Sequence, residues 1–283
     1  MKKNKKTWLM AALVVLLLLA GLSLLLYPTV SNYFNTVRQA QSILSYDDEI
    51  AALEEEENRR LWQAAEEYNR SLLDRPSAFS LTDAQEAAYP TTLLAGSSSV
   101  MAYLEIPSID VKLPVLHGVS ADTLQKAVGH LEWSSLPVGG ESTHCVLSGH
   151  RGLPSSELLT NIDRLTYGDV FYLHVLGQKL EYRVDRITVV EPDDLSQLGI
   201  IEGLDCVTLV TCTPYGINSH RLLVRGIRME SSTHTGSFLD LPNEAKPMTL
   251  PWLMPALLGV LGLTGLFLLL PPGRKRKKKG ATP

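Results

Sequence analysis

The stretch Val207-Thr-Leu-Val-Thr-Cys-Thr-Pro-Tyr-Gly216 reads as one short β-strand that is stopped almost at once. Its first half is aliphatic or β-branched at every position, which favours a strand, and Pro214 and Gly216 are residue types that end one. Cys212 therefore stands where the strand ends. A side chain at that point is lifted off the sheet toward a rim, where a substrate can reach it.

Similar short runs of β-branched, aromatic and aliphatic residues surround this strand, with Gly and Pro between them. The runs are residues 100–106, 111–116, 144–147, 170–175, 180–187 and 221–225. Gly177-Gln178 fits a hairpin turn, and only residues 120–128 and 155–165 look helical in this region. Roughly seven or eight short strands without long alternating helices favour a mainly β fold, a closed or nearly closed barrel, over a parallel α/β sheet.

The segment ahead of these strands divides into a helical part and a loop. Residues 36–73 carry an imperfect apolar stripe among many charged residues, and the charged side is typical of a solvated helix face. Residues 74–99 contain Pro76, Pro90 and Gly96 with little periodicity, so they are predicted to form a loop. A loop of that length in a compact domain is usually a functional cover or disorder.

Two stretches without any charged residue, 8–26 and 251–272, are each long enough to cross a hydrocarbon layer about 30 Å thick. Four lysines precede the first, and residues 274–279 after the second are all Lys or Arg. This pattern predicts a cell-membrane protein with both termini in the cytoplasm and residues 28–250 outside. A cleavable signal peptide is the alternative for the first stretch, but its apolar run is long and no small-residue cleavage site follows closely.

Most of the positive charge lies in those two clusters. Without their ten cations the chain keeps 16 Lys and Arg against 30 Asp and Glu, a net charge of −14 for residues 7–273. A segment that acidic is a poor candidate for binding nucleic acid through phosphate contacts.

These patterns divide the chain as follows. We expect a cytoplasmic tail and anchor over 1–27, a helical region and lid-like loop over 28–99, a β-barrel over 100–230, a polar linker over 231–250, a second anchor over 251–272 and a basic cytoplasmic tail over 273–283. No internal repeat is apparent. The barrel is therefore the part in which chemistry is sought.

A thiol is a working nucleophile only when a nearby cation or base helps to remove its proton, because its ordinary pKa lies near about 8.5. A strand end offers no helix dipole, so side chains must supply that help to Cys212. The loop after Cys212 is short, and the next strand begins beside it at His220-Arg221. Arg221 can therefore lie near the sulfur or near the carbonyl that it attacks, as a fixed cation for an oxyanion.

The base is sought among the seven histidines. His150 is favoured because it closes the run Val146-Leu-Ser-Gly-His150 and so shares with Cys212 a place just beyond a hydrophobic strand. His220 is the rival, on proximity alone. The residues without comparable context, which we expect at the surface or in packing, are His117, His130, His174 and His234. Cys212 could also be a buried, inert thiol, and then the set has no catalytic role.

Thr208-Leu-Val-Thr-Cys212 resembles the TLxTC signature of the sortase family, and His150 and Arg221 fall at the spacings of that family's catalytic His and Arg. Residues 100–228 resemble sortases throughout. The runs Leu147-Ser-Gly-His-Arg-Gly-Leu-Pro154 and Cys212-Thr-Pro-Tyr-Gly-Ile-Asn-Ser-His-Arg-Leu-Leu-Val-Arg-Gly226 are especially similar to class C, the pilin-polymerising sortases of Gram-positive bacteria. A second anchor is also a class C feature. The resemblance implies a sortase-type eight-stranded β-barrel.

The resemblance also implies a membrane-anchored cysteine transpeptidase. Cys212 would attack the Thr–Gly bond of an LPxTG-like sorting signal, Arg221 would stabilise the oxyanion or position the substrate, and His150 would protonate the leaving amine. A lysine amine of another pilin subunit would then resolve the thioester to an isopeptide bond. This chemistry needs no metal or organic cofactor, and its partners are LPxTG-bearing pilins in the same membrane.

Two further expectations come with the family. Class C enzymes typically carry a lid with an Asp-Pro-aromatic motif, and this chain has Asp74-Arg-Pro-Ser-Ala-Phe79, in which these types are not contiguous. Asp74 and Phe79 are the candidate lid residues. The strands that end at His150 and Cys212 are expected to be parallel neighbours, which would put Cys145 and Cys206 almost level, as a disulfide or, as adjacent-strand geometry favours, as two buried thiols.

Two other functions stay open. A housekeeping sortase that attaches proteins to peptidoglycan would use the same chemistry, but the lid-like segment and the second anchor argue against it. A non-catalytic surface protein could use a β-barrel to bind peptides. Alkylating Cys212 separates these, since peptide binding could survive the modification and transpeptidation could not.

Overall fold

The computed structural model describes residues 5–229. The described residues fall into two units, 5–25 and 26–229. The predicted linker at 231–250, the second anchor at 251–272, the basic tail at 273–283 and His234 lie outside the described residues. The barrel and the elements that pack on it belong to the second unit.

The first helix, α1 (Lys5–Ala52), is 48 residues long with Pro28 inside it. Its apolar part reaches a mean hydropathy of 2.9, and by length and composition it can cross a membrane. The large apolar side chains there are exposed, Leu24 by 77%. A core helix of a soluble domain would bury one such face, so the pattern fits a membrane anchor.

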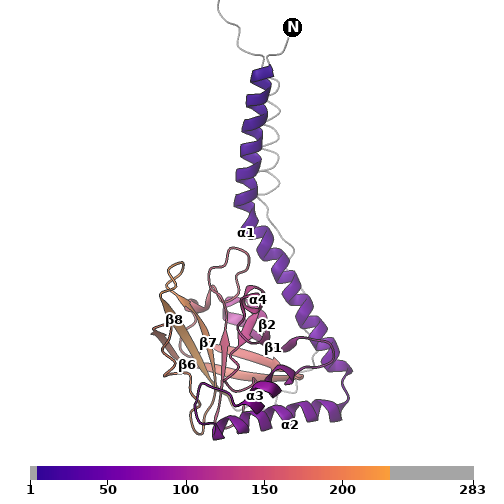
Figure 1. Ribbon diagram of the computed structural model, residues 1–283, viewed down its shortest axis with the longest axis vertical. Helices are drawn as coiled ribbons and strands as arrows, with labels where there is room; N and C mark the ends of the chain where they lie inside the picture. The colour runs from indigo at the N-terminus through magenta and orange to yellow at the C-terminus, as the bar shows by residue number, and fades with distance from the viewer. Residues whose placement is uncertain (1–4, 230–283) are drawn as a thin grey trace, which may run out of the picture. The chain divides into compact units, whose positions relative to one another are not determined.

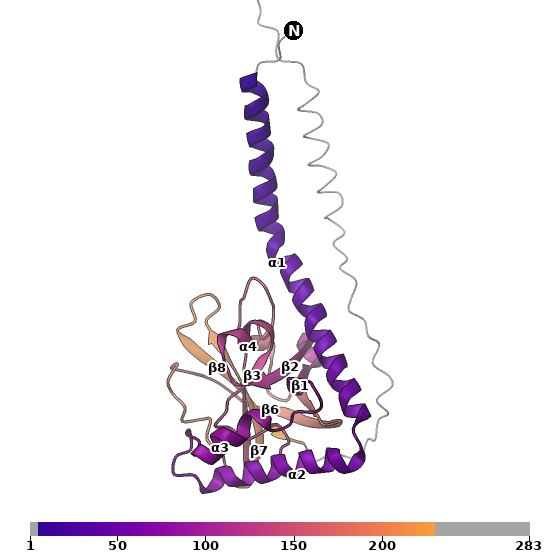
Figure 2. The ribbon, with the colours of Figure 1, turned by 45° about the vertical axis from the view of Figure 1, so that its right-hand side comes forward.

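The helical region predicted at 36–73 is two helices. α1 ends at Ala52, and α2 (Glu55–Ser71) begins after Glu54, whose backbone is extended. Glu55, Glu56 and Glu57 occupy the first turn of α2, where the helix dipole favours negative charge, whereas four consecutive glutamates inside one helix would repel. In both views α2 lies across one end of the barrel (Figures 1 and 2).

The prediction of a continuous loop over 74–99 is partly wrong. The segment contains a short helix, α3 (Asp83–Ala88), between the 3-10 turns Leu72–Asp74 and Tyr89–Thr91. Thr82 and Gln85 form a reciprocal capping box at its start. Threonine followed three residues later by glutamine is a local sequence signal for such a start.

Eight strands form one closed barrel in the order β1-β2-β3-β4-β7-β8-β6-β5. They are β1 (Val100–Ile106), β2 (Val111–His117), β3 (Val128–His130), β4 (Thr143–Ser148), β5 (Val170–Val175), β6 (Gln178–Val190), β7 (Asp205–Thr213) and β8 (His220–Arg228). The predicted mainly β barrel of eight strands is confirmed. Its interior is filled by fully buried side chains, among them Leu104, Leu147, Phe171 and Leu209.

Two local predictions in the barrel, the helix at 120–128 and the hairpin turn, need correction. The helix expected at 120–128 is α4 (Ala121–Lys126), capped by Ser120, and Val128 begins β3 because its backbone pairs with β2. The hairpin turn is Leu176-Gly177, both with positive φ, and not Gly177-Gln178.

Residues 155–165 are not an α-helix. Only Ile162–Arg164 forms a 3-10 turn. A helix would pair the Ser155 carbonyl with the Leu159 N–H, but here that carbonyl accepts from Asn35 Nδ2 and the Leu159 N–H donates to the His150 carbonyl. The Glu157 N–H donates to Asn32 Oδ1. Long-range contacts with α1 thus override the local pattern.

His130 on β3 is fully buried, and its ring is held on both sides. Nδ1 lies 2.9 Å from the Tyr89 hydroxyl, and Nε2 lies 2.8 Å from the Ser135 carbonyl oxygen. A carbonyl can only accept, so Nε2 carries the proton of the neutral ring. Burial lowers the pKa of His130 to about 4, since the charged imidazolium loses its hydration.

Because the His130 ring is buried in its neutral form, we expect the folded protein to lose stability in acid. The unfolded histidine has a pKa of 6.5 and the folded one about 4, so its contribution to stability is complete above pH 6.5 and is lost as the pH falls toward 4. We expect His130→Asn to flatten the dependence of the unfolding free energy on pH in that range, measured by urea unfolding. His220→Asn, at a position with a 40% exposed side chain, is the control that keeps the wild-type slope. Equal slopes in wild type and His130→Asn would contradict this account.

Candidate active site

Cys212 and the segment that carries His150 lie on neighbouring parallel strands. β4 pairs with β7 with Ser148 level with Val210. The pairing continues past the end of β4, because the Gly149 N–H donates to the Val210 carbonyl at 3.0 Å. Two residues further along each strand, this register brings His150 to the level of Cys212.

Arg221 completes the arrangement from the other side. β8 is antiparallel to β7, and Arg221 is the direct partner of Cys212. Partner residues on adjacent strands point to the same face of a sheet. The side chains of Cys212 and Arg221 therefore share one face, and His150 lies level with Cys212 on the neighbouring segment. The Arg221 guanidinium donates to the carbonyls of Asn218 and His220 at 3.3 and 3.1 Å. The three predicted residues therefore come together, each half-buried at the rim.

The face of the sheet also separates the two candidate histidines. His220 is the partner of Thr213, one residue beyond Cys212, so it points to the opposite face. Its Nε2 lies 3.3 Å from Glu191 Oε1. The geometry thus favours His150 over His220 as the partner of the thiol.

The other described histidines are engaged elsewhere. His130 is the buried ring on β3, His117 packs on the Tyr89 ring, and His174 lies 2.6 Å from a Glu105 carboxylate oxygen. His144 lies between the Gly199 carbonyl and the Thr208 hydroxyl, each at 2.7 Å. Within residues 5–229, no group of three or more His, Cys, Asp or Glu side chains is arranged to hold a metal ion.

The face that carries Cys212 continues into an apolar surface. Its buried members, which we call the outer apolar cluster, are Val146, Val190, Leu198, Val210 and Leu223. Val210 stands two residues before Cys212, and Leu223 is its partner on β8. Apolar side chains thus lead directly up to the thiol on the same face of the sheet.

The lid-like segment covers part of this cluster. Phe79 packs edge-on against Trp133, with ring centroids 5.1 Å apart, and both rings pack on the outer apolar cluster. Arg75 Nη1 donates to the Trp133 carbonyl at 2.5 Å. Asp74 is exposed, so Arg75 and Phe79 hold the segment in place and Asp74 does not.

Cys145 and Cys206 are buried thiols and form no disulfide. Cys145 is level with Val207, and Cys206 is level with His144. The two cysteines are therefore one residue out of step, almost level as expected, but they point to opposite faces, which agrees with the favoured expectation of two buried thiols. Burial raises the pKa of Cys206 to about 12 and raises that of Cys145 strongly, so neither is a reactive thiolate.

Several residues that hold the strand ends were missed from the sequence. Thr211 Oγ1 donates to the Gly149 carbonyl at 2.8 Å, directly before His150. Arg151 forms an ion pair with Asp163 at 2.5 Å and lies over the Tyr215 ring. The sequence offered one signal for the role of Thr211. Two threonines interrupt an otherwise apolar strand, and a buried hydroxyl needs a hydrogen-bond partner.

The chain is similar to known proteins. A family model for the sortase domain matches residues 104–229. The structure of sortase C1 from Streptococcus agalactiae is 44% identical, with a TM-score of 0.65, and the match covers 68% of this chain and 99% of that one. Sortase C from Clostridium perfringens, solved with the C-terminal cell wall sorting motif, is 46% identical, with a TM-score of 0.60 and coverage of 68% and 99%.

A curated relative gives a shorter match. Sortase D of Bacillus subtilis is 32% identical over 129 residues, which are 44% of this chain and 62% of that protein. The match thus spans less than two thirds of that relative.

The burial of the cysteines predicts a thiol count. In the native protein an alkylating reagent should modify one thiol, Cys212, because the other two are buried. After unfolding without a reductant all three should react, as counted by mass spectrometry. Cys212→Ser should reduce the native count to zero. A single reactive thiol in the unfolded, unreduced chain would mean that Cys145 and Cys206 are paired after all.

Proposed function

The chain belongs to the sortase family, in its class C group, and from this premise we propose that it is a membrane-anchored cysteine transpeptidase that joins pilin subunits. The observation that carries the proposal is the direct pairing of Cys212 with Arg221, with the parallel strand β4 ending beside them two residues before His150. Nucleophile, cation and acid then stand on one rim.

The first half of the reaction is acyl transfer to the thiol. The Cys212 thiol passes its proton to His150, the thiolate attacks the carbonyl carbon of the Thr–Gly bond in an LPxTG-like sorting signal, and a tetrahedral oxyanion forms. Arg221 is the fixed cation on the same face, so its guanidinium stabilises that oxyanion or holds the substrate beside it. His150 gives a proton to the leaving amine, the C–N bond breaks, and a thioester remains on Cys212.

The second half releases the product. A lysine amine of another pilin subunit attacks the thioester carbonyl, the C–S bond breaks, and an isopeptide bond joins the two subunits. No metal or organic cofactor takes part in these steps. The Clostridium perfringens sortase C with its sorting motif supports the choice of substrate class.

The outer apolar cluster supports a docking place for the sorting signal. It leads along β7 to Cys212, and its aliphatic side chains fit the Leu and Pro of the signal. Phe79 and Trp133 pack on the same cluster. We therefore assign the segment that carries Asp74 and Phe79 as a lid, with Phe79 as the residue that excludes the substrate.

The proposed location follows from the charge pattern and from the apolar start of α1. α1 is the described anchor. Both termini are proposed to lie in the cytoplasm and the barrel outside the cell, with residues 251–272 as the second span. Sorting-signal substrates held in the same membrane would then meet the site.

Replacing the nucleophile tests the proposed chemistry. Cys212→Ala should abolish the covalent adduct with an LPxTG peptide, seen by mass spectrometry, because no other exposed thiol can form the thioester. Arg221→Lys should lower the rate by about a hundredfold, since an ammonium cannot reproduce the planar fork. Cys145→Ala, at a buried thiol outside the site, is the control that keeps the adduct. An adduct at the wild-type level in Cys212→Ala would rule the assignment out.

Shortening Phe79 tests the lid. Phe79→Ala removes the ring that packs on Trp133 and the outer apolar cluster, so alkylation of Cys212 and adduct formation should both become faster. Leu73→Ala, in the same segment but with its side chain exposed, is the matched control. Rates in Phe79→Ala equal to those in Leu73→Ala would mean that Phe79 does not guard the site.

A further inference from the structure

The loop that follows His150 folds back on the histidine. The Leu159 N–H donates to the His150 carbonyl at 3.2 Å, and the Gly152 N–H donates to Thr160 Oγ1 at 3.1 Å. Leu159 also packs closely on Gly149, where any added Cβ would lie 2.7 Å from a leucine methyl. His150 therefore sits at the base of a closed loop, residues 151–161, and moves only if that base moves.

The tip of the same loop is bound by α1. Asn32 Oδ1 accepts from the Glu157 N–H at 2.8 Å, and Asn35 Nδ2 donates to the Ser155 carbonyl at 2.7 Å. Gln39, one turn further along, donates to the Lys126 carbonyl at 2.9 Å. Residues three and four apart lie on one helix face, so these amides form one polar edge that faces the barrel. We call Asn32 and Asn35 the amide clamp.

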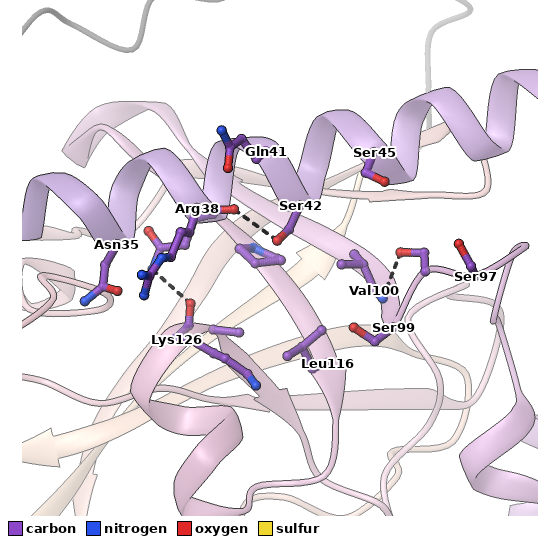
Figure 3. Close-up of a pocket in the computed structure, with 14 residues that line it drawn as sticks. Asn35, Arg38, Gln41, Ser42, Ser45, Ser97, Ser99, Val100, Leu116 and Lys126 are labelled. Atoms are coloured by element: carbon purple, nitrogen blue, oxygen red, sulfur yellow. Dashed lines mark hydrogen bonds between the residues drawn. The ribbon is translucent and has the colours of Figure 1, made fainter.

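The amide clamp acts without apolar packing around it. None of residues 32–39 belongs to the buried apolar core of the described chain, whose members on α1 begin at Ile43. Beside the clamp a groove of about 580 Å³ separates α1 from the barrel. Figure 3 shows Asn35 and Ser42 on its helix side and Leu116 and Lys126 on its barrel side. Hydrogen bonds therefore fix this part of α1 to the loop.

We propose that Asn32 and Asn35 are positioning residues for the reaction, because they hold the loop whose base carries His150. The inference rests on the proposed function of His150. α1 continues without a break from the clamp to its apolar start, so the anchor and the loop share one helix. Loosening the clamp should displace His150 from the level of Cys212 and slow the protonation of the leaving amine.

The two amides allow a matched test, because one accepts and the other donates. Asn32→Asp keeps an oxygen acceptor for the Glu157 N–H, whereas Asn32→Ala removes it. Asn35→Asp adds the same charge but sets a carboxylate against the Ser155 carbonyl. Thr36→Ala changes the exposed side chain directly after Asn35 and is the control. Each variant is made in the full-length chain in detergent micelles.

We expect Asn32→Ala and Asn35→Asp to speed hydrogen exchange in residues 151–161 and to lower kcat with an LPxTG peptide by about tenfold to a hundredfold, as small displacements of reacting groups do. KM should not change, since no member of the outer apolar cluster lies on α1. Asn32→Asp and Thr36→Ala should behave as wild type.

Three results would overturn the inference. They are unchanged exchange in Asn32→Ala and Asn35→Asp, faster exchange with unchanged kcat, and an Asn32→Asp variant as slow as Asn35→Asp. If the wild-type chain forms no adduct with the peptide, the proposed function is what fails. The His150 imidazole resonance then decides the inference by NMR: a shift in Asn32→Ala and Asn35→Asp that Asn32→Asp restores supports it, and no shift overturns it.

Discussion

The parallel pairing of β4 with β7 is the contact on which the site depends. It sets Ser148, the last residue of β4, level with Val210 near the end of β7. His150 and Cys212, which are far apart in the sequence, are thereby brought to one rim. The antiparallel partner β8 adds the arginine at the same level. Because side chains alternate between faces, a slip of one residue in either pairing would turn one of these groups away.

The pairing is reinforced by polar side chains that cross between the two strands. Thr208 bonds to the His144 ring, and Thr211 bonds to the Gly149 carbonyl. Both contacts are buried, so breaking either would leave an unpaired polar group inside the protein. They therefore oppose slippage in a way that aliphatic packing, which tolerates small shifts, does not. The two threonines of the signature thus specify register.

The sequence predicted the parts of the fold that local pattern controls. The runs at 100–106 and 170–175 were predicted as strands because they are rich in β-branched, aromatic and aliphatic residues and turn residues lie between such runs. Strand ends likewise pointed to His150 and Cys212. The pattern failed where a distant partner decides the conformation. Val128 is a strand residue only because β2 lies beside it, and residues 155–157 are irregular because α1 takes their hydrogen bonds. The spacing of Cys145 from His150 and of Cys206 from Cys212 gave their one-residue offset, and the pairing of β4 with β7 shows that this offset turns the two thiols to opposite faces.

Folding of the closed barrel depends on contacts between residues that are far apart in the sequence. Thr211 and Gly149 meet across a separation of 62 residues, and β1 must pair with β5 to complete the ring. Contacts between residues so distant in sequence form slowly, because the intervening chain must first be ordered. The thiol, the imidazole and the guanidinium come from segments of the chain that such long-range pairings bring together. The reactive arrangement is therefore complete only after these pairings have formed.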